Sequence, residues 1–131
     1  MQSTAASKRR RYLELNQKYL LEAEKLLDES DFVQASEKYW AAAIEIVKAY
    51  AAENGKILRI HRELRDYIRK LGNKHPKLEL MSLFVDAEAL HANFYEDELS
   101  PEGVEKYSKS VKAFNLRMHG LLLEDKEESP R

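Results

Sequence analysis

The chain has 131 residues, of which 44% are hydrophobic and 34% are charged, and its formal net charge at pH 7 is −1. This length predicts one domain that buries a single hydrophobic core. The absence of cysteine excludes disulfide bonds, thiolate metal sites and a cysteine nucleophile. No apolar run approaches the ~18 residues of a membrane span, and Met1–Arg11 lacks the apolar centre of a signal peptide. We therefore expect a cytoplasmic protein without a membrane partner.

The first predicted helix begins within Lys8–Tyr12 and runs to about Leu27. Its apolar face carries one polar residue, Asn16, among leucines and alanine at helical spacing. Residues 1–10 are expected to form a flexible basic N-terminus, because Met1–Ser7 has no helical pattern. The Lys8-Arg9-Arg10-Arg11 cluster lies at a helix start, where the helix dipole disfavours cations. It is either an arm that contacts an anion or a solvated, frayed end.

The second helix has the strongest signals in the chain. Asp31 can cap its start, with Gln34 at the third helical position of a capping box. Apolar side chains then recur every three or four residues, and the small run Ala41-Ala42-Ala43 lets another helix approach closely. Asn54-Gly55 predicts a left-handed C-terminal cap. Trp40 lies beside the apolar stripe rather than at its centre. An aromatic residue at helical spacing is usually part of the core, and the alternative is that Trp40 faces another subunit.

The third helix lies within Ile57–Leu71. Its apolar residues share one side, except Leu58, which indicates a loop and a true start nearer His61. The opposite side carries a stripe of arginines that could follow a phosphate backbone, namely Arg59, Arg62, Arg65 and Arg69. The stripe could equally be a solvated face that pairs with Glu63 and Asp66 or with the acidic segment that follows. Residues 56–77 carry a local excess of six positive charges, and residues 78–106 an excess of seven negative charges.

Two further helices follow a break at Gly72–Pro76, and Pro76 is expected in the first turn of the fourth. Ser100-Pro101 predicts the start of the fifth, as a serine cap followed by proline. The fifth helix carries a seam in alternating threes and fours, formed by Val104, Tyr107, Val111, Phe114, Met118 and Leu121. The pattern predicts an all-α, up-and-down bundle of four to five helices over residues 11–122. Residues 123–131 are expected to form a disordered charged tail.

Two histidines, His61 and His91, fall on apolar helical faces. Each is either an imidazole at the edge of the core or part of one shared polar pocket near Glu63 or Glu88. Asn93 and Tyr95 flank His91 and could bind a ligand or cap the end of the fourth helix. No cofactor or metal is expected, because three or four convergent ligands with local spacing are absent from the sequence.

The run AEKLLDESDFVQASEKYWAAAIEIVKAYAAENG, followed by IHREL and ALHANFYE, resembles the archaeal PaREP family. That family is a branch of the HEPN (higher eukaryotes and prokaryotes nucleotide-binding) helical domains. The resemblance implies a HEPN-like bundle of four or five helices and frequent homodimers. It also implies a link to nucleotides, RNA or toxin–antitoxin pairs.

Catalytic HEPN domains cleave RNA without metal through an arginine followed, after four to six residues, by a histidine. Arg69 and His75 fit that spacing, so the resemblance makes them the candidate catalytic pair. The preferred hypothesis is a non-catalytic, HEPN-like module that binds RNA or a nucleotide or joins a toxin–antitoxin-type complex. Its binding residues would come from the arginine stripe and from His61, His91, Asn93 and Tyr95. The alternatives are a metal-independent ribonuclease and a helical scaffold for a partner protein. Trp40 and the fifth-helix seam suggest a homodimer.

Overall fold

The computed structural model of the chain describes residues 4–128, and this part contains helices and no strand. The elements are α1 Ala5–Asp28, α2 Phe32–Glu53, α3 His61–Lys74, the short 3₁₀ helix η1 Pro76–Leu78, α4 Leu80–Glu96 and α5 Pro101–Glu128. None of the helices in this part of the chain combines the length and the apolar character that a membrane crossing requires.

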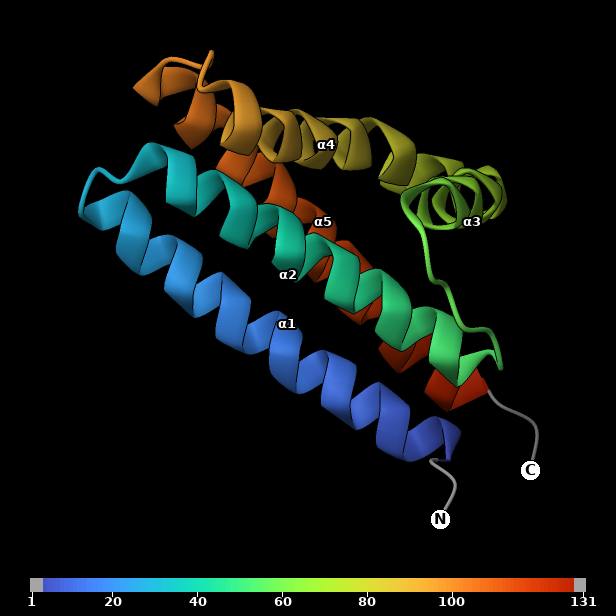
Figure 1. Cartoon of the computed structure of the whole chain (residues 1–131). Helices are drawn as coiled ribbons and strands as arrows, with labels where there is room; N and C mark the ends of the chain where they lie inside the picture. Colours follow the sequence, from blue (N-terminus) through green and yellow to red (C-terminus); the bar gives the residue numbers. More distant parts are fainter. Residues whose placement is uncertain (1–3, 129–131) are drawn as a thin grey trace.

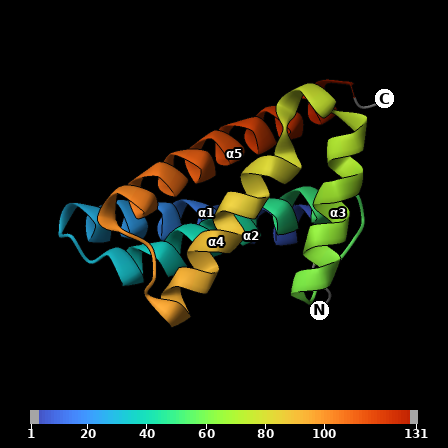
Figure 2. The ribbon, with the colours of Figure 1, turned by 90° about the horizontal axis from the view of Figure 1, so that it is seen from above.

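Four long helices form an up-and-down bundle, which confirms the predicted fold class. α1 and α2 run antiparallel as a hairpin, while α4 and α5 form a second antiparallel pair that packs against α2 (Figure 1). The shorter α3 crosses one end of this bundle and contacts α4 and α2 (Figure 2). The residues of α3 therefore lie at the edge of the core, where they meet both layers.

The start of α1 differs from the prediction. The helix begins at Ala5, where the Thr4 hydroxyl accepts a hydrogen bond from the Ser7 N–H at 3.0 Å. Residues 5–10 are therefore helical rather than a flexible arm. The threonine cap satisfies a free N–H group at the helix start, and this offsets the unfavourable placement of the basic cluster.

The boundaries of α2 and the start of α3 agree with the sequence. The Asp31 carboxylate accepts a hydrogen bond from the Gln34 N–H at 3.3 Å, and Gly55 adopts a φ of 76° after α2. α3 begins at His61, and Leu58 lies in the preceding loop with its side chain packed against the core. The Glu63 carboxylate accepts hydrogen bonds from the backbone N–H groups of Arg59 and Ile60, at 2.6 and 3.3 Å.

Two expectations about chain breaks are wrong. α3 continues through Gly72 to Lys74, and Pro76 opens η1 rather than α4. α4 starts only at Leu80, after Glu79 turns the chain with a left-handed φ of 53°. At the other end of the chain, α5 extends to Glu128, where a disordered tail was predicted from residue 123. Residues 1–3 and 129–131 lie outside the described part.

The apolar seam of α5 is buried inside the subunit. Val104, Val111, Phe114 and Met118 are fully buried, and the Phe114 ring lies 5.9 Å from that of Phe84 on α4. Trp40 is only 3% exposed and packs within the bundle, so of its two readings the structure has the core position and not a face toward another subunit. Both features that suggested a homodimer are therefore used in the core of one chain.

One polar network crosses this core. Asn16 on α1 is 2% exposed, and its amide nitrogen donates to the Ala42 carbonyl of α2 and to the Asn115 side-chain oxygen of α5, both at 2.8 Å. His119 Nε2 lies 3.4 Å from the Asn16 side-chain oxygen. Because buried amides cost stability unless they are bonded, this network fixes how α1, α2 and α5 meet.

We expect Phe114→Ala to lower the free energy of unfolding by about 3–5 kcal/mol, because it removes a buried ring and leaves a cavity. The matched control is Leu116→Ala on the same helix, whose side chain is 72% exposed and whose loss should change stability by less than about 0.5 kcal/mol. Urea unfolding followed by circular dichroism measures both. Equal effects of the two changes would contradict the assignment of the core.

The second prediction concerns acid stability. Burial lowers the pKa of His119 below its usual value of 6.5. Between the folded and unfolded pKa values, the unfolded chain binds more protons, so this contribution to stability is complete above about pH 6.5 and is lost as pH falls. His119→Gln should therefore reduce the loss of stability between pH 7.5 and pH 5. Chemical unfolding of both proteins across this range tests it, and parallel pH profiles would count against it.

Candidate functional site

The start of α3 brings both predicted histidines together around the only tryptophan of the chain. The rings of His61 (α3) and His91 (α4) have centroids 6.0 Å apart. The His91 ring stacks on Trp40 of α2, with centroids 4.8 Å apart and an angle of 21° between the planes. His61 contacts the same indole at 4.9 Å. The two histidines therefore lie together at the edge of the core, against the same indole.

A carboxylate holds each imidazole. Glu88 on α4 bonds to His61 Nε2 at 2.8 Å, and Glu37 on α2 bonds to His91 Nδ1 at 3.0 Å. Such a bond fixes the orientation of the ring and places a proton on the bonded nitrogen. The other nitrogen of each ring makes no hydrogen bond to a residue within 4–128. The cluster can therefore offer two oriented imidazole nitrogens to a ligand or to solvent.

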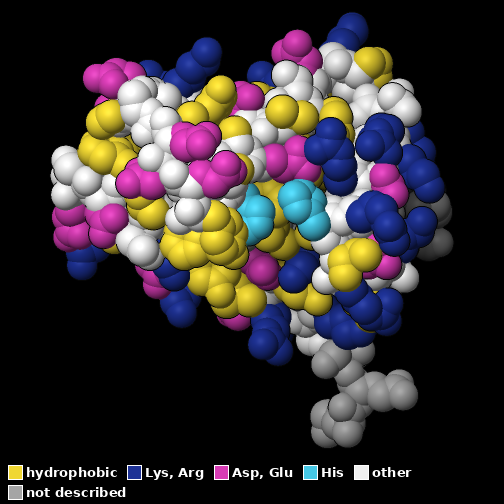
Figure 3. Space-filling view, turned by 45° about the horizontal axis from the view of Figure 1, so that its top comes forward, with side chains coloured by type: hydrophobic (Ala, Val, Ile, Leu, Met, Phe, Trp, Pro, Cys, Tyr) yellow, Lys and Arg dark blue, Asp and Glu magenta, His cyan; other side chains and the backbone are white. Residues whose placement is uncertain are grey.

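The cluster lies at the surface between two kinds of neighbour. The side chains of His61 and His91 are 46% and 29% exposed. Figure 3 shows two histidines side by side, with a hydrophobic patch on one side and a gathering of lysines and arginines on the other. Arg65 also binds the Glu88 carboxylate, so Glu88 joins α3 to α4 through two side chains. This pairing is the attraction between the basic and acidic segments that the charge pattern allowed.

The arginine stripe is divided between paired and solvent-facing residues. Arg65 is bound to Glu88, and Arg69 is bound to Asp66 within α3 at 2.6 Å. Arg59 and Arg62 are exposed and make no ion pair within the described part of the chain. The arginine that reaches the histidine cluster is thus Arg65 rather than Arg69.

The two residues that flank His91 point in opposite directions. Asn93 is 3% exposed, and its amide donates to the Ser36 hydroxyl at 3.1 Å while its oxygen accepts from the Leu99 N–H at 2.8 Å. Asn93 therefore joins α4 to α2 through Ser36 and holds the loop after α4 through Leu99. Tyr95 is 72% exposed and meets the His91 ring edge-on at 5.5 Å, so it is free to contact a ligand.

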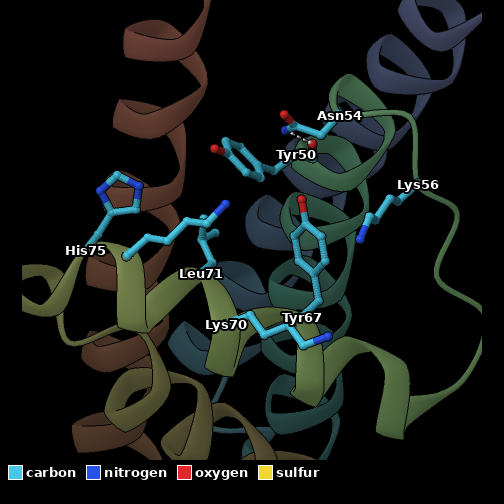
Figure 4. A pocket seen from close by; sticks show the side chains of 8 residues that line it. Tyr50, Asn54, Lys56, Tyr67, Lys70, Leu71 and His75 are labelled. Carbon is cyan, nitrogen blue, oxygen red and sulfur yellow. Dashed lines mark hydrogen bonds between the residues drawn. The ribbon is translucent and has the colours of Figure 1, made fainter.

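His75 lies at a second place, at the far end of α3. A pocket of about 420 Å³ opens there between the ends of α2 and α3. Tyr50 and Tyr67 lie next to each other in its middle, with Lys56 on one side and His75 on the other (Figure 4). Its remaining lining residues are Asn54, Lys70, Leu71 and Lys74.

This pocket is strongly basic. Three lysines and a histidine line it, and no aspartate or glutamate does. The two tyrosine rings lie 6.4 Å apart and form its aromatic wall. Lysine ammonium groups and an imidazole can hold an anionic oxygen, while an aromatic wall can cover a planar group. Arg69 is not among the lining residues, so the predicted catalytic pair does not meet in this pocket.

Sequence reasoning missed several of these residues. Glu37 and Trp40 are one helical turn apart on α2, but their partners on α3 and α4 are distant in sequence and so could not be assigned. Lys70 and Lys74 also share one helical face, at an i,i+4 spacing that could have been noticed. No group of three or more histidine, aspartate or glutamate side chains in the described part of the chain is arranged to hold a metal.

The Glu88 carboxylate bonds to two side chains of α3, and this gives a test of how the helix is held. Glu88 is 14% exposed and binds both His61 and Arg65. Glu88→Ala should lower the free energy of unfolding by about 1 kcal/mol and should speed hydrogen exchange in α3 more than in α2. Glu98→Ala, at an exposed loop position, is the matched control. Unchanged exchange in α3 would show that apolar contacts alone hold this helix.

Comparisons with known proteins place the chain in a family. A model of the archaeal PaREP1/PaREP8 family matches residues 11–115. The chain is also similar to a protein of known crystal structure from Sulfolobus solfataricus, with 27% sequence identity and a TM-score of 0.73. That similarity covers 82% of this chain and 96% of the Sulfolobus chain. No curated protein matches the sequence. Because the family model spans most of the sequence, the chain belongs to the archaeal PaREP1/PaREP8 family.

Proposed function

We propose that the chain is a non-catalytic binding module for RNA or a nucleotide, and that the pocket between α2 and α3 holds a phosphate group. The observation that carries this proposal is the composition of the pocket wall. Lys56, Lys70, Lys74 and His75 line it without any opposing carboxylate. A phosphate is the common biological anion that such a set of donors suits best.

The aromatic wall of the pocket supports a nucleic-acid ligand over a bare anion. Tyr50 is 5% exposed, so it forms the floor, while the partly exposed Tyr67 offers aromatic surface near Lys56 and Lys70. A base or a sugar can lie against such a ring while its phosphate reaches the lysines. Aromatic rings beside lysines distinguish a nucleotide site from a surface that attracts anions only by its charge.

The positions of the charged residues around α3 favour a ligand longer than one nucleotide. Arg59 and Arg62 lie exposed at the start of α3, and the lysines of the pocket lie near its end. They place positive charge near both ends of this helix. RNA that enters the pocket at one end of α3 could then follow the surface through contacts with its phosphates. The resemblance to HEPN domains agrees with such a ligand.

The other hypotheses from the sequence stay predictions. A ribonuclease that uses Arg69 and His75 receives less support than binding, because Arg69 bonds to Asp66 and lies outside the pocket lining. A homodimer, a toxin–antitoxin-type complex or a protein scaffold would need surfaces other than Trp40 and the α5 seam, which are buried. The exposed apolar side chains of Leu21, Leu116 and Tyr95 are available for such contacts.

The test compares two double variants with the same change of net charge. Lys70→Ala/Lys74→Ala should weaken binding of a fluorescent single-stranded RNA about tenfold or more and lower the salt dependence of binding by about one to two counterions. Lys106→Ala/Lys109→Ala removes two exposed lysines of α5 and should leave affinity within about twofold. Fluorescence anisotropy across a salt series measures both. Equal losses in the two variants, or no RNA binding by the unaltered chain, would contradict the proposal.

A further inference from the structure

The histidine cluster, formed by His61, His91 and Trp40, contains two polar atoms that the proposed RNA site does not use. His61 Nε2 is bonded to Glu88 at 2.8 Å, and His91 Nδ1 is bonded to Glu37 at 3.0 Å. A carboxylate can only accept a hydrogen bond, so in each neutral imidazole the bonded nitrogen carries the proton. His61 Nδ1 and His91 Nε2 therefore each carry a free lone pair.

This pairing of imidazole and carboxylate is the arrangement in which histidine binds metal ions. A histidine that binds a metal usually donates its other ring N–H to a carboxylate, which orients the ring and makes the free nitrogen more basic. His61 and His91 both have such a partner. The other histidines, His75 and His119, are bonded to no carboxylate in the described part of the chain.

The two rings are close enough to share one ion, although they belong to different helices. His61 is the first residue of α3, and His91 lies on α4. Because zinc lies about 2.0–2.1 Å from an imidazole nitrogen, two rings on one ion have centres about 5–6.5 Å apart. The centres of these two rings are 6.0 Å apart. Both rings reach the surface, where Figure 3 shows two histidines side by side, so an ion can enter from solvent.

The charges around the cluster favour a cation. Glu37 and Glu88 bring two negative charges, and Arg65, which also binds Glu88, brings one positive charge. The start of a helix slightly disfavours a cation, but the Glu63 carboxylate lies in the first turn of α3 and offsets this effect.

From these contacts we propose that His61 Nδ1 and His91 Nε2 together bind one divalent transition-metal ion, with water in its remaining positions. The expectation of no metal concerned sites with three or four protein ligands, and this site has two. The ion fastens the first turn of α3 to α4, because it is bonded to both helices. The site is separate from the lysine pocket and does not depend on the proposed RNA-binding function.

The ligand atoms determine which ions bind. Imidazole nitrogen suits zinc, nickel and copper, whereas Mg²⁺ and Ca²⁺ prefer oxygen ligands. Two protein ligands hold zinc less tightly than the four of a structural site, so we expect a dissociation constant of about 1–100 μM. A site formed by the two carboxylates instead would also bind Mg²⁺, so this preference distinguishes the two kinds of site.

The experiment is titration calorimetry of the full chain, purified without a polyhistidine tag and freed of metal with EDTA before dialysis. Zinc chloride and nickel chloride should each bind once per chain, and magnesium chloride should not bind. A zinc dissociation constant above about 1 mM, or magnesium binding as tight as zinc binding, would overturn the proposal.

Four single variants assign the site. His61→Gln, at a side chain that is 46% exposed, and His91→Gln should each weaken zinc binding about tenfold or more. His75→Gln and His119→Gln remove the other two imidazoles and should leave the affinity within about twofold. Circular dichroism checks the fold, and His61→Gln alone decides the matter if the loss of the His91 ring unfolds the chain. Wild-type affinity in a folded His61→Gln protein, or loss of binding in His75→Gln, would overturn the proposal.

Two further measurements distinguish a built site from two neighbouring histidines. Glu37→Gln keeps the shape of the side chain but removes the carboxylate that orients His91, so it should weaken zinc binding about tenfold. Glu98→Gln, at an exposed loop position, is the matched control. Zinc should also slow hydrogen exchange in the first turn of α3, but not in His61→Gln. Unchanged exchange with zinc bound would overturn the proposal, since it would show that the ion does not join α3 to α4.

Discussion

The burial of α2 is the constraint on which the rest of the structure depends. Thirteen of its 22 residues are buried, which leaves little of the helix for solvent. A helix that is buried on most sides must be covered by several others, and α2 contacts α1, α3, α4 and α5. Its alanines, at positions such as 42, 43 and 49, permit these close approaches because they add little volume.

The attachment of α3 is of a different kind. Leu64, Ile68 and Leu71 bury one face of this helix, but its first turn is held by polar side chains that reach Glu88 on α4. Partly exposed ion pairs contribute less to stability than buried apolar contacts do. The first turn of α3 therefore has fewer strong contacts than α2 or α5. Both the histidine cluster and the basic pocket include α3, so its position affects each of them.

The sequence alone was enough to predict the features that depend on residues close together in the chain. The caps at Asp31, Gly55 and Ser100 and the period of apolar residues in α5 follow from neighbours in the chain, and they locate the helices. The starts of α1 and α4 were predicted at the wrong residues. They depend on weaker signals, namely the Thr4 cap before Ala5 and the left-handed conformation of Glu79 after Pro76. The convergence of His61 with His91 was a stated alternative, since both lie on apolar faces. Their partners Glu88 and Glu37 depend on the angles at which the helices cross, and these angles cannot be read from a single sequence. The core position of Trp40 was the first of its two readings, because an aromatic residue at helical spacing usually packs.

The place of Trp40 has a practical consequence. It is the only tryptophan of the chain, and it lies between two imidazoles that come from α3 and α4. An indole in such a position senses its neighbours, because its emission depends on local polarity and on nearby charge. Any rearrangement of α3, or any ligand that displaces an imidazole from the indole, should therefore alter the intrinsic fluorescence of the unlabelled protein. The molecule thus contains its own optical reporter, located at the contact between three of its helices.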